Sequence, residues 1–173
     1  MTYQEIRDKA RSIIGDKCKV CPDCNGLACR GQVPGVGGKG LGNSFVRNRA
    51  MVLNRKLHLD TLVPAETIDT SIHIFGREFK YPIFAAPIGA LELNYHPSLN
   101  DLTYNERIVQ GCAEAGIMAF TGDGAKMEYY EGPLQIIENH EGIGVPTIKP
   151  WDNDAVISKI RMAEAHSVTA LSM

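Results

Sequence analysis

The sequence lacks an excess of basic residues, a long apolar run and a leader-like N-terminus. Its 173 residues carry a formal net charge of −2, with a pI near 6.2, whereas a nucleic-acid-binding domain is normally basic. No window approaches the roughly 18 apolar residues of a membrane span. The opening Met1-Thr2-Tyr3-Gln4-Glu5 is not built like a signal peptide. We therefore expect a cytoplasmic protein that binds neither nucleic acid nor membrane.

The glycine-rich segment at 31–42 also lacks what a nucleotide-binding loop requires. Gly35, Gly37 and Gly40 fit G-x-G-x-x-G, but no predicted strand precedes them. A Walker A motif is excluded because Val33 stands where its first glycine would be. We interpret the segment as a flexible loop that lies against another surface and could fold over a site as a lid.

Four of the five cysteines fall in one short segment with the spacing C-x2-C-x2-C-x4-C. They are Cys18, Cys21, Cys24 and Cys29. Without a secretory signal, such a cluster indicates metal ligation or redox chemistry in preference to disulfide bonds. C-x2-C turns can bring two thiolates onto one metal, and Pro22 and Gly26 favour turns. The four thiols are thus predicted ligands of Zn or an iron–sulfur cluster, and the alternative is a loop of reduced thiols.

Local signals before residue 81 predict two helices and a hairpin. Thr2 and Glu5 form a capping box, and Gly15 follows the helix that they start. Alternating residues on either side of Gly76-Arg77 are typical of a hairpin. The expected elements are an amphipathic helix at 3–14, a helix from Asn43 or Ser44 to about Leu57, and a hairpin over 70–80.

Residues 80–90 predict a buried strand that ends in a tight turn. Ile83 to Ala86 are all apolar without alternation, which is typical of a parallel strand covered on both faces. Pro87 has no N–H to continue the ladder, and Gly89 allows close backbone approach or a positive φ. Strand carboxyl ends carry the ligand sites of α/β folds, so this turn is a candidate site.

After this strand, strands and helices alternate. Strand starts near 82, 117, 145 and 168 are separated by 35, 28 and 23 residues, which are βα-unit lengths. The intervening helices are expected from a capping box at Thr103 and Glu106, from Pro133, and from Asp152 or Asn153. Asp123, between two glycines after the second strand, is interpreted as a turn residue.

Four βα units predict an α/β fold, either a small open sheet or, as we expect, the first half of a (β/α)8 TIM barrel. The N-terminal helices, the Cys- and Gly-rich segment and the hairpin precede it. We expect three segments, at 1–43, 44–81 and 82–173, with the barrel truncated after its fourth strand.

From about Phe45 to Met173 the sequence resembles the FMN-dependent α-hydroxy-acid oxidase/dehydrogenase family, which includes lactate and glycolate oxidases. The motifs that stand in the family's order are Asn48-Arg49-Ala50, Leu62-Val63, Asp69-Thr70-Ser71, Phe75-Gly76, Pro82-Ile83, Ala86-Pro87-Ile88-Gly89-Ala90, His96-Pro97, Ala113-Glu114-Ala115-Gly116 and Ala170-Leu171-Ser172. The resemblance implies a (β/α)8 barrel with FMN at the carboxyl ends of its strands.

The resemblance also implies a set of flavin contacts. They are Ala86, Pro87, Ile88, Gly89, Ala90, Thr121 or Gly122, and Lys149. Lys149 stands where the family usually has a Gln at the pyrimidine edge, and an ammonium there would favour negative charge at N1/O2 of the reduced flavin. Trp151 stands near a family Tyr that faces the substrate, whose hydroxyl it cannot supply.

The implied reaction is oxidation of a small, lactate-like L-2-hydroxy acid, with a hydride equivalent passing to flavin N5. The catalytic His, the Arg for the substrate carboxylate, the flavin-facing Lys and the phosphate site all belong to the second half of the family's barrel. No catalytic residue is therefore expected in this chain, which we do not expect to be active alone. Its expected partner is a C-terminal half-barrel chain or a second copy of itself.

Three alternatives stand beside this interpretation. The Cys segment could be a metal- or cluster-binding module on an inactive half-barrel scaffold. The half barrel could be inactive and pair with itself to cover its open edges. FMN-dependent isopentenyl-diphosphate isomerase has a similar barrel entry, although its first-strand motif ends in Thr-Gly-Gly, which Ile88-Gly89-Ala90 fits less well.

Overall fold

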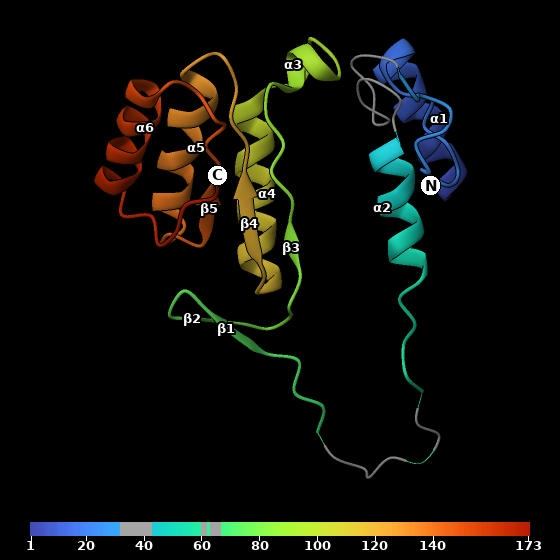
Figure 1. The fold of residues 1–173 in the computed structure, drawn as a ribbon, viewed down its shortest axis with the longest axis horizontal. Coiled ribbons are helices and arrows are strands. Elements are labelled where there is room, and N and C mark those ends of the chain that lie inside the picture. Colours follow the sequence, from blue (N-terminus) through green and yellow to red (C-terminus); the bar gives the residue numbers. More distant parts are fainter. Residues whose placement is uncertain (32–42, 60–61, 63–66) are drawn as a thin grey trace. The chain divides into compact units, whose positions relative to one another are not determined.

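The structure is a computed structural model that describes residues 1–31, 43–59, 62 and 67–173 (Figure 1). The chain divides into two compact units. Unit 1 comprises Met1–Glu66 with Asn94–His96, and unit 2 comprises Thr67–Leu93 with Pro97–Met173. The expected glycine-rich loop lies largely outside the described residues. The expected segments at 1–43, 44–81 and 82–173 remain a prediction about domain organisation.

Unit 1 contains helix α1 (Tyr3–Ile14), the short helix η1 (Gly15–Lys17) and helix α2 (Asn43–Leu53). The predicted capping box is confirmed, because the Thr2 hydroxyl accepts from Glu5 N and the Glu5 carboxylate accepts from Thr2 N. Gly15 ends α1 with a φ of 63°. Helix α2 ends at Leu53, so the expectation that it continues to about Leu57 is wrong.

The apolar face of α1 is only partly buried. Ile6 and Ile13 are 49% and 39% exposed, and the one buried residue of α1 is Arg7. Its guanidinium donates to Val20 O at 2.8 Å, which attaches the start of the cysteine segment to the helix. Ala10 and Ile14 are half-buried on the same side of the helix as Arg7, so the amphipathic pattern predicted the helix and part of the face that it buries.

Unit 2 holds two sheets and four α-helices among its described residues. The strands are β1 (Ile72–Ile74), β2 (Arg77–Phe79), β3 (Phe84–Ala85), β4 (Met118–Thr121) and β5 (Gly144–Pro146). The helices are α3 (Leu91–Asn94), α4 (Asp101–Ala115), α5 (Glu128–Asn139) and α6 (Asn153–Ala165). Strands β3, β4 and β5 form a parallel sheet in that order, and β1 pairs with β2 as the expected hairpin.

Helices α4, α5 and α6 cover one face of the parallel sheet (Figure 1). Ala119 of β4 packs against Val109 and Cys112 of α4 and Ile137 of α5, all of them buried. A second cluster joins α5 and α6 to the residues after β5. Its buried members are Tyr130, Leu134, Ile148 and Ala163. This burial supports the βα units that the spacing predicted.

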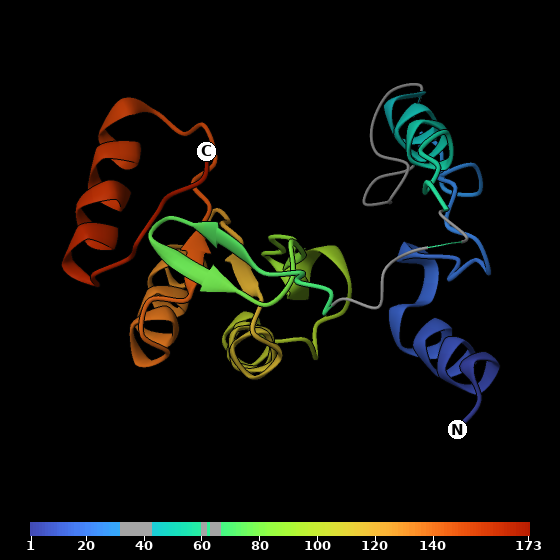
Figure 2. The same cartoon turned by 90° about the horizontal axis from the view of Figure 1, so that it is seen from below.

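The hairpin lies at the end of the sheet where the strands begin (Figure 2). Phe79 of β2 packs with Met118 and Val145, and Lys80 N donates to Gly116 O at 2.8 Å just before β4. Phe75 and Gly76 both have positive φ, which suits a two-residue hairpin turn. The turn therefore lies one residue earlier than the expected Gly76-Arg77, because Arg77 already pairs with Ile74. With the hairpin at the amino ends, the loops after β3, β4 and β5 form the opposite, carboxyl end.

Two expectations about the strands are wrong. Ile83 and Phe84 are 62% and 52% exposed, because β3 is an edge strand and no described element covers its outer side. Residues 168–171 form no strand, and the chain there makes only an isolated parallel bridge between Thr147 and Ser172. Burial and pairing both need a neighbouring strand, which apolar sequence alone does not supply.

Two helix starts also differ from the sequence prediction. Asn100, rather than Thr103, caps α4, and its side chain accepts from Thr103 N at 3.1 Å. Helix α5 begins at Glu128 and contains Pro133, which was expected to open it. Glu128 and Glu131 in the first turn favour the earlier start because they complement the helix dipole. Within the described residues, no helix is long and apolar enough to cross a membrane.

Candidate functional site

The turns after β3 and β4 touch through two glycines at the carboxyl end of the sheet. A Cβ on Gly122 would lie 2.3 Å from Ile88 C and 2.4 Å from Gly89 N. A Cβ on Gly89 would lie 2.9 Å from Asp123 N. Only glycine fits both positions, because the neighbouring atoms are backbone atoms that cannot rotate away. The close approach predicted at Gly89 is therefore made to the next strand-end turn.

Asp123, directly after β4, joins three segments at this end of the sheet. Its Oδ2 accepts from Lys149 N at 3.0 Å and from Trp151 Nε1 at 2.6 Å. Its Oδ1 accepts from Gly124 N at 2.8 Å and pairs with Lys159 Nζ. Asp123 is only 2% exposed. It is therefore more than the turn residue that the sequence suggested, because it fixes the loop after β5 and helix α6 to the end of β4.

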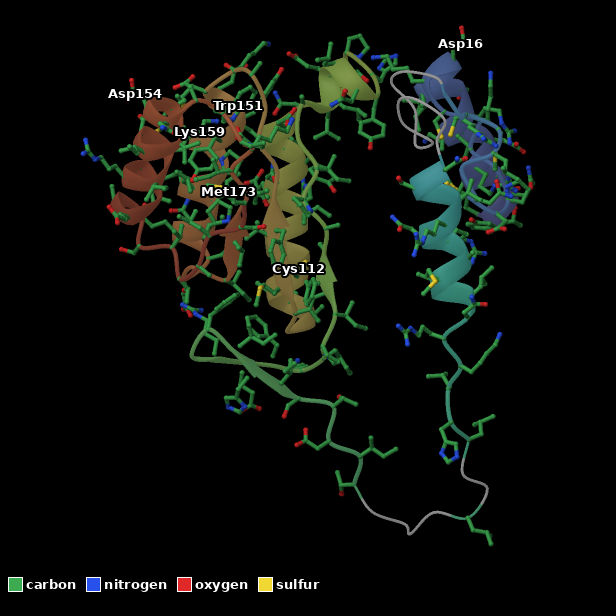
Figure 3. The ribbon with its side chains drawn as sticks, in the orientation of Figure 1. Asp16, Cys112, Trp151, Asp154, Lys159 and Met173 are labelled. Carbon is green, nitrogen blue, oxygen red and sulfur yellow. The ribbon has the colours of Figure 1, made fainter. Side chains whose placement is uncertain are left out.

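Lys159 brings a buried cation to the same place. It is 3% exposed, and its Nζ lies 4.8 Å from the centre of the Tyr130 ring and 5.4 Å from that of the Trp151 ring. Tyr130 OH donates to Lys159 O at 3.1 Å. Figure 3 shows Lys159 close to Trp151, which stands just before α6 in the chain. The ammonium thus has one charged partner and two aromatic faces.

Two groups in this cluster have shifted pKa values. Burial alone would raise the pKa of Asp123, but donation from Lys159, Lys149 N and Trp151 outweighs it and lowers that pKa. Burial, with a smaller contribution from the Asp123 charge, raises the pKa of Tyr130. Asp123 is therefore an ionised acceptor and Tyr130 a protonated donor over the ordinary pH range.

The side chain of Asp101, at the start of α4, binds the backbone of the turn after β3. Its carboxylate accepts from Ala90 N at 2.7 Å and from Leu91 N at 2.9 Å, and it is 4% exposed. Ala90 has a φ of +56°, a conformation that L side chains rarely adopt. The Ala90 amide therefore already has a partner. The structure therefore opposes the predicted availability of this amide to a ligand.

The other predicted site residues differ in their exposure. Ala86, Pro87 and Lys149 are exposed, and Trp151 is 37% exposed. Ile88 and Gly89 are half-buried, whereas Thr121 and Gly122 are buried. The geometry brings together Gly89, Gly122, Lys149 and Trp151, which come from three strand ends.

Two threonine hydroxyls near these strand ends are buried without a hydrogen-bond partner. They are Oγ1 of Thr121 and Oγ1 of Thr147. Thr121 lies two residues after Ala119, which packs against the helices, so it is on the helix side of the sheet. Thr147 lies two residues after Val145, which packs on the opposite face. Thr147 is therefore the hydroxyl that can meet a ligand on the face away from the helices.

The predicted metal ligands lie in unit 1. All five cysteines are outside disulfides, and no group of three or more His, Cys, Asp or Glu in the described ranges could hold a metal ion. Burial and the three neighbouring thiols raise the pKa of Cys24. A raised pKa favours the thiol, whereas the thiolate is the metal ligand. The structure thus does not support the predicted Zn or iron–sulfur site.

The sequence does contain an indication that Lys159 is buried, namely its position on the apolar face of a helix. Val156, Ile160 and Ala163 define the apolar face of α6, and Lys159 falls on that same face. A lysine on a buried helix face needs a charged partner. Asp123 is that partner, 36 residues earlier.

A parallel sheet that is covered by helices defines an α/β protein, and its polar groups gather at the strand carboxyl ends, where α/β folds carry their ligand sites. Over residues 36–173 the sequence matches the FMN-dependent dehydrogenase family, and the chain belongs to that family. FMN is accordingly the cofactor that its family indicates. No curated protein gave a significant match.

A solved structure supports the fold. The chain is similar to a putative lactate oxidase of Pediococcus acidilactici, with a TM-score of 0.63 at 16% identity. The match covers 97% of this chain and 41% of the oxidase, so the chain spans about two fifths of that protein's length. The predicted α/β class and the predicted family are both confirmed.

The residues at the strand ends fit a flavin. Thr147 offers an unpartnered buried hydroxyl on the face away from the helices, and the exposed Lys149 offers a cation two residues further on. The exposed Ala86 and Pro87 leave backbone accessible at the neighbouring strand end. Small apolar side chains that leave the backbone accessible, with a few polar groups beside them, suit the flat face and polar edge of an isoalloxazine ring.

Proposed function

We propose that this chain forms one wall of the flavin site in an FMN-dependent oxidoreductase that acts on a small L-2-hydroxy acid. The observation that carries the proposal is the meeting of three strand-end loops, through the Gly89–Gly122 contact and through Asp123. Family membership and the likeness to a lactate oxidase fold support it.

Each residue of the wall has a distinct role in this proposal. The backbone of Ala86 to Gly89 and Gly122 faces the flavin ring, while the Thr147 hydroxyl and the Lys149 ammonium bind its pyrimidine edge. Trp151 supplies an apolar surface on the substrate side. FMN, when bound, would supply the acceptor for the hydride equivalent that leaves the hydroxyl-bearing carbon, and the His on the second half of the barrel would take the hydroxyl proton.

The rest of the active site comes from outside these residues in our proposal. The catalytic His, the carboxylate-binding Arg and the phosphate site lie on a second half of the barrel, which completes the half formed by this chain. The exposed edge strand β3, with Ile83 and Phe84, supports such pairing. The second half is supplied by further sequence or by another chain, since a second copy of this chain would carry the same residues and add neither the His nor the Arg.

The first prediction concerns flavin binding by the isolated chain. If the chain contacts the ring but not the phosphate, FMN and riboflavin should bind with dissociation constants equal within about twofold, since a twofold ratio is only ~0.4 kcal/mol. Quenching of flavin fluorescence during titration with the chain measures both constants. Adenosine monophosphate, which has a phosphate but no flavin ring, is the control ligand and should not compete.

Two results would contradict this assignment. FMN binding at least about tenfold tighter than riboflavin, or ~1.4 kcal/mol, would place a phosphate site within the chain. Failure of both flavins to bind would show that the chain does not form the proposed flavin site.

Substrate class is tested on the completed protein, where anaerobic L-lactate should reduce the flavin and so bleach its visible absorption. An isomerase with the same cofactor would leave it oxidised.

The second prediction concerns the charge at Lys149. Lys149→Gln in the flavin-loaded protein should lower the two-electron midpoint potential, because an ammonium near N1/O2 stabilises the reduced, anionic flavin. The expected change is about 30 mV, or ~1.4 kcal/mol. Spectroelectrochemical titration measures it. Arg161→Gln, at an exposed cation of α6, is the control and should leave the potential unchanged. An unchanged midpoint potential in Lys149→Gln would mean that the Lys149 ammonium does not lie near the flavin.

A further inference from the structure

We propose that Asp123 and Lys159 are positioning residues, which fix the Trp151 indole and the Lys149 peptide at the rim of the flavin site. The role of that rim rests on the proposed function, but the positioning itself is a property of this chain. Neither residue belongs to the flavin contacts that the family resemblance implies. Both are at least 97% buried, which separates them from the exposed rim that they hold.

The first support is that one oxygen of the Asp123 carboxylate binds two donors from the loop after β5. One oxygen, Oδ2, accepts from both Lys149 N and Trp151 Nε1. The backbone at Lys149 and the side chain of Trp151 therefore share a single anchor. Lys149 is exposed and Trp151 is 37% exposed, so this buried carboxylate ties an exposed part of the loop to the end of β4.

The second support is the way in which Lys159 holds the anchor. Its ammonium pairs with Oδ1, the oxygen that does not contact the loop. The same ammonium lies 5.4 Å from the centre of the Trp151 ring. Lys159 thus acts on Trp151 twice, through the carboxylate and through the ring face. The Tyr130 hydroxyl donates to the backbone carbonyl of Lys159 and so helps to hold that residue in place.

A catalytic role for Asp123 is not compatible with this geometry. Four donors occupy its two oxygens, and the side chain is 2% exposed. A general base needs an acceptor position free toward the proton that it removes. Asp123 therefore acts through Trp151 and Lys149, and does not act on the substrate itself.

The chain contains one tryptophan, so fluorescence that is excited selectively in tryptophan and the indole N–H signal both report on Trp151 alone. In the wild-type chain, the indole N–H should exchange with solvent at least about tenfold more slowly than in a free indole, although the ring is 37% exposed. Proton–nitrogen correlation spectra in deuterated solvent measure this without any variant. Rapid exchange would overturn the proposal.

Variants then test each partner. Asp123→Asn and Lys159→Met should each shift the Trp151 emission to longer wavelength and raise the acrylamide quenching constant about twofold, since the indole loses its anchor. Asp154→Asn and Arg161→Met are matched controls on exposed residues of α6, the helix that carries Lys159, and should emit like the wild type. Figure 3 labels Asp154 on that helix. Circular dichroism confirms that each chain is folded. Folded Asp123 and Lys159 variants with wild-type emission and quenching would overturn the proposal.

Should a single variant not fold, the double variant Asp123→Asn/Lys159→Met removes both charges together and should still free the indole.

Measuring riboflavin affinity beside Trp151 emission distinguishes a failure of this proposal from a failure of the proposed function. Altered Trp151 emission in a chain whose wild type binds no flavin would sink the flavin site and leave the positioning role intact. Flavin binding that is unchanged in Asp123→Asn, together with unchanged emission, would sink the positioning role alone.

Discussion

Lys159→Met should lower the free energy of unfolding by about 3–5 kcal/mol, because removing one partner of a buried ion pair leaves the other charge uncompensated. The remaining charge is the Asp123 carboxylate, which is 2% exposed and would keep only its backbone donors and Trp151. Urea denaturation, followed by circular dichroism at neutral pH, measures the change.

The same variant should reverse the dependence of stability on pH. In the wild-type fold the pKa of Asp123 is lowered, so its ionised form stabilises the fold above the unfolded-state pKa of about 3.9. That stabilisation is lost as the pH falls from there through the lower, folded pKa. Without Lys159 the carboxylate loses both its strongest donor and the charge of the ammonium, so we expect burial to outweigh the remaining donors and raise the pKa. Stability should then increase as the pH falls from neutral through the raised folded pKa, toward about 3.9.

Two further variants make this prediction specific. Arg161→Met removes an exposed cation from the same helix and should change stability by less than about 0.5 kcal/mol. Asp123→Asn/Lys159→Met should be more stable than Lys159→Met, since no buried charge remains. Equal losses in Lys159→Met and Arg161→Met would mean that the ammonium is solvated and that the pair is not a buried one.

The elements that the sequence predicted well are those encoded by neighbouring residues. The Thr2–Glu5 capping box closes within one turn, and the hairpin needs only Gly76 and the alternation on either side of it. The parallel order of the strands followed from the βα spacing, which is also local. Motifs spread from Phe45 onward were sufficient to indicate the family.

The features that the sequence did not predict depend on partners far along the chain. Ile83 and Phe84 are apolar enough for a buried strand, yet what covers β3 decides their burial. Lys159 lies on an apolar helix face, but nothing near it in sequence identifies Asp123 as the partner. A pattern can therefore show that a residue needs a partner without showing which residue it is.

Gly122→Ala should lower the free energy of unfolding by about 3 kcal/mol, at the upper end of the usual cost of overpacking. The added methyl would overlap the backbone of Ile88 and Gly89, which can make room only if the two strand-end turns separate. Because these turns carry proposed flavin contacts, riboflavin affinity should fall at least about tenfold, or ~1.4 kcal/mol. Urea denaturation and fluorescence titration measure the two effects.

Gly111→Ala is the matched control for Gly122→Ala. Gly111 lies within α4, and an added Cβ there would meet no atom within 4 Å. Since alanine favours a helix more than glycine does, this variant should gain about 1 kcal/mol of stability and keep its flavin affinity. If Gly122→Ala proved as stable as the wild type, the two turns would have to be further apart than the glycine contact requires. The strand ends would then not form the single wall on which the flavin proposal depends.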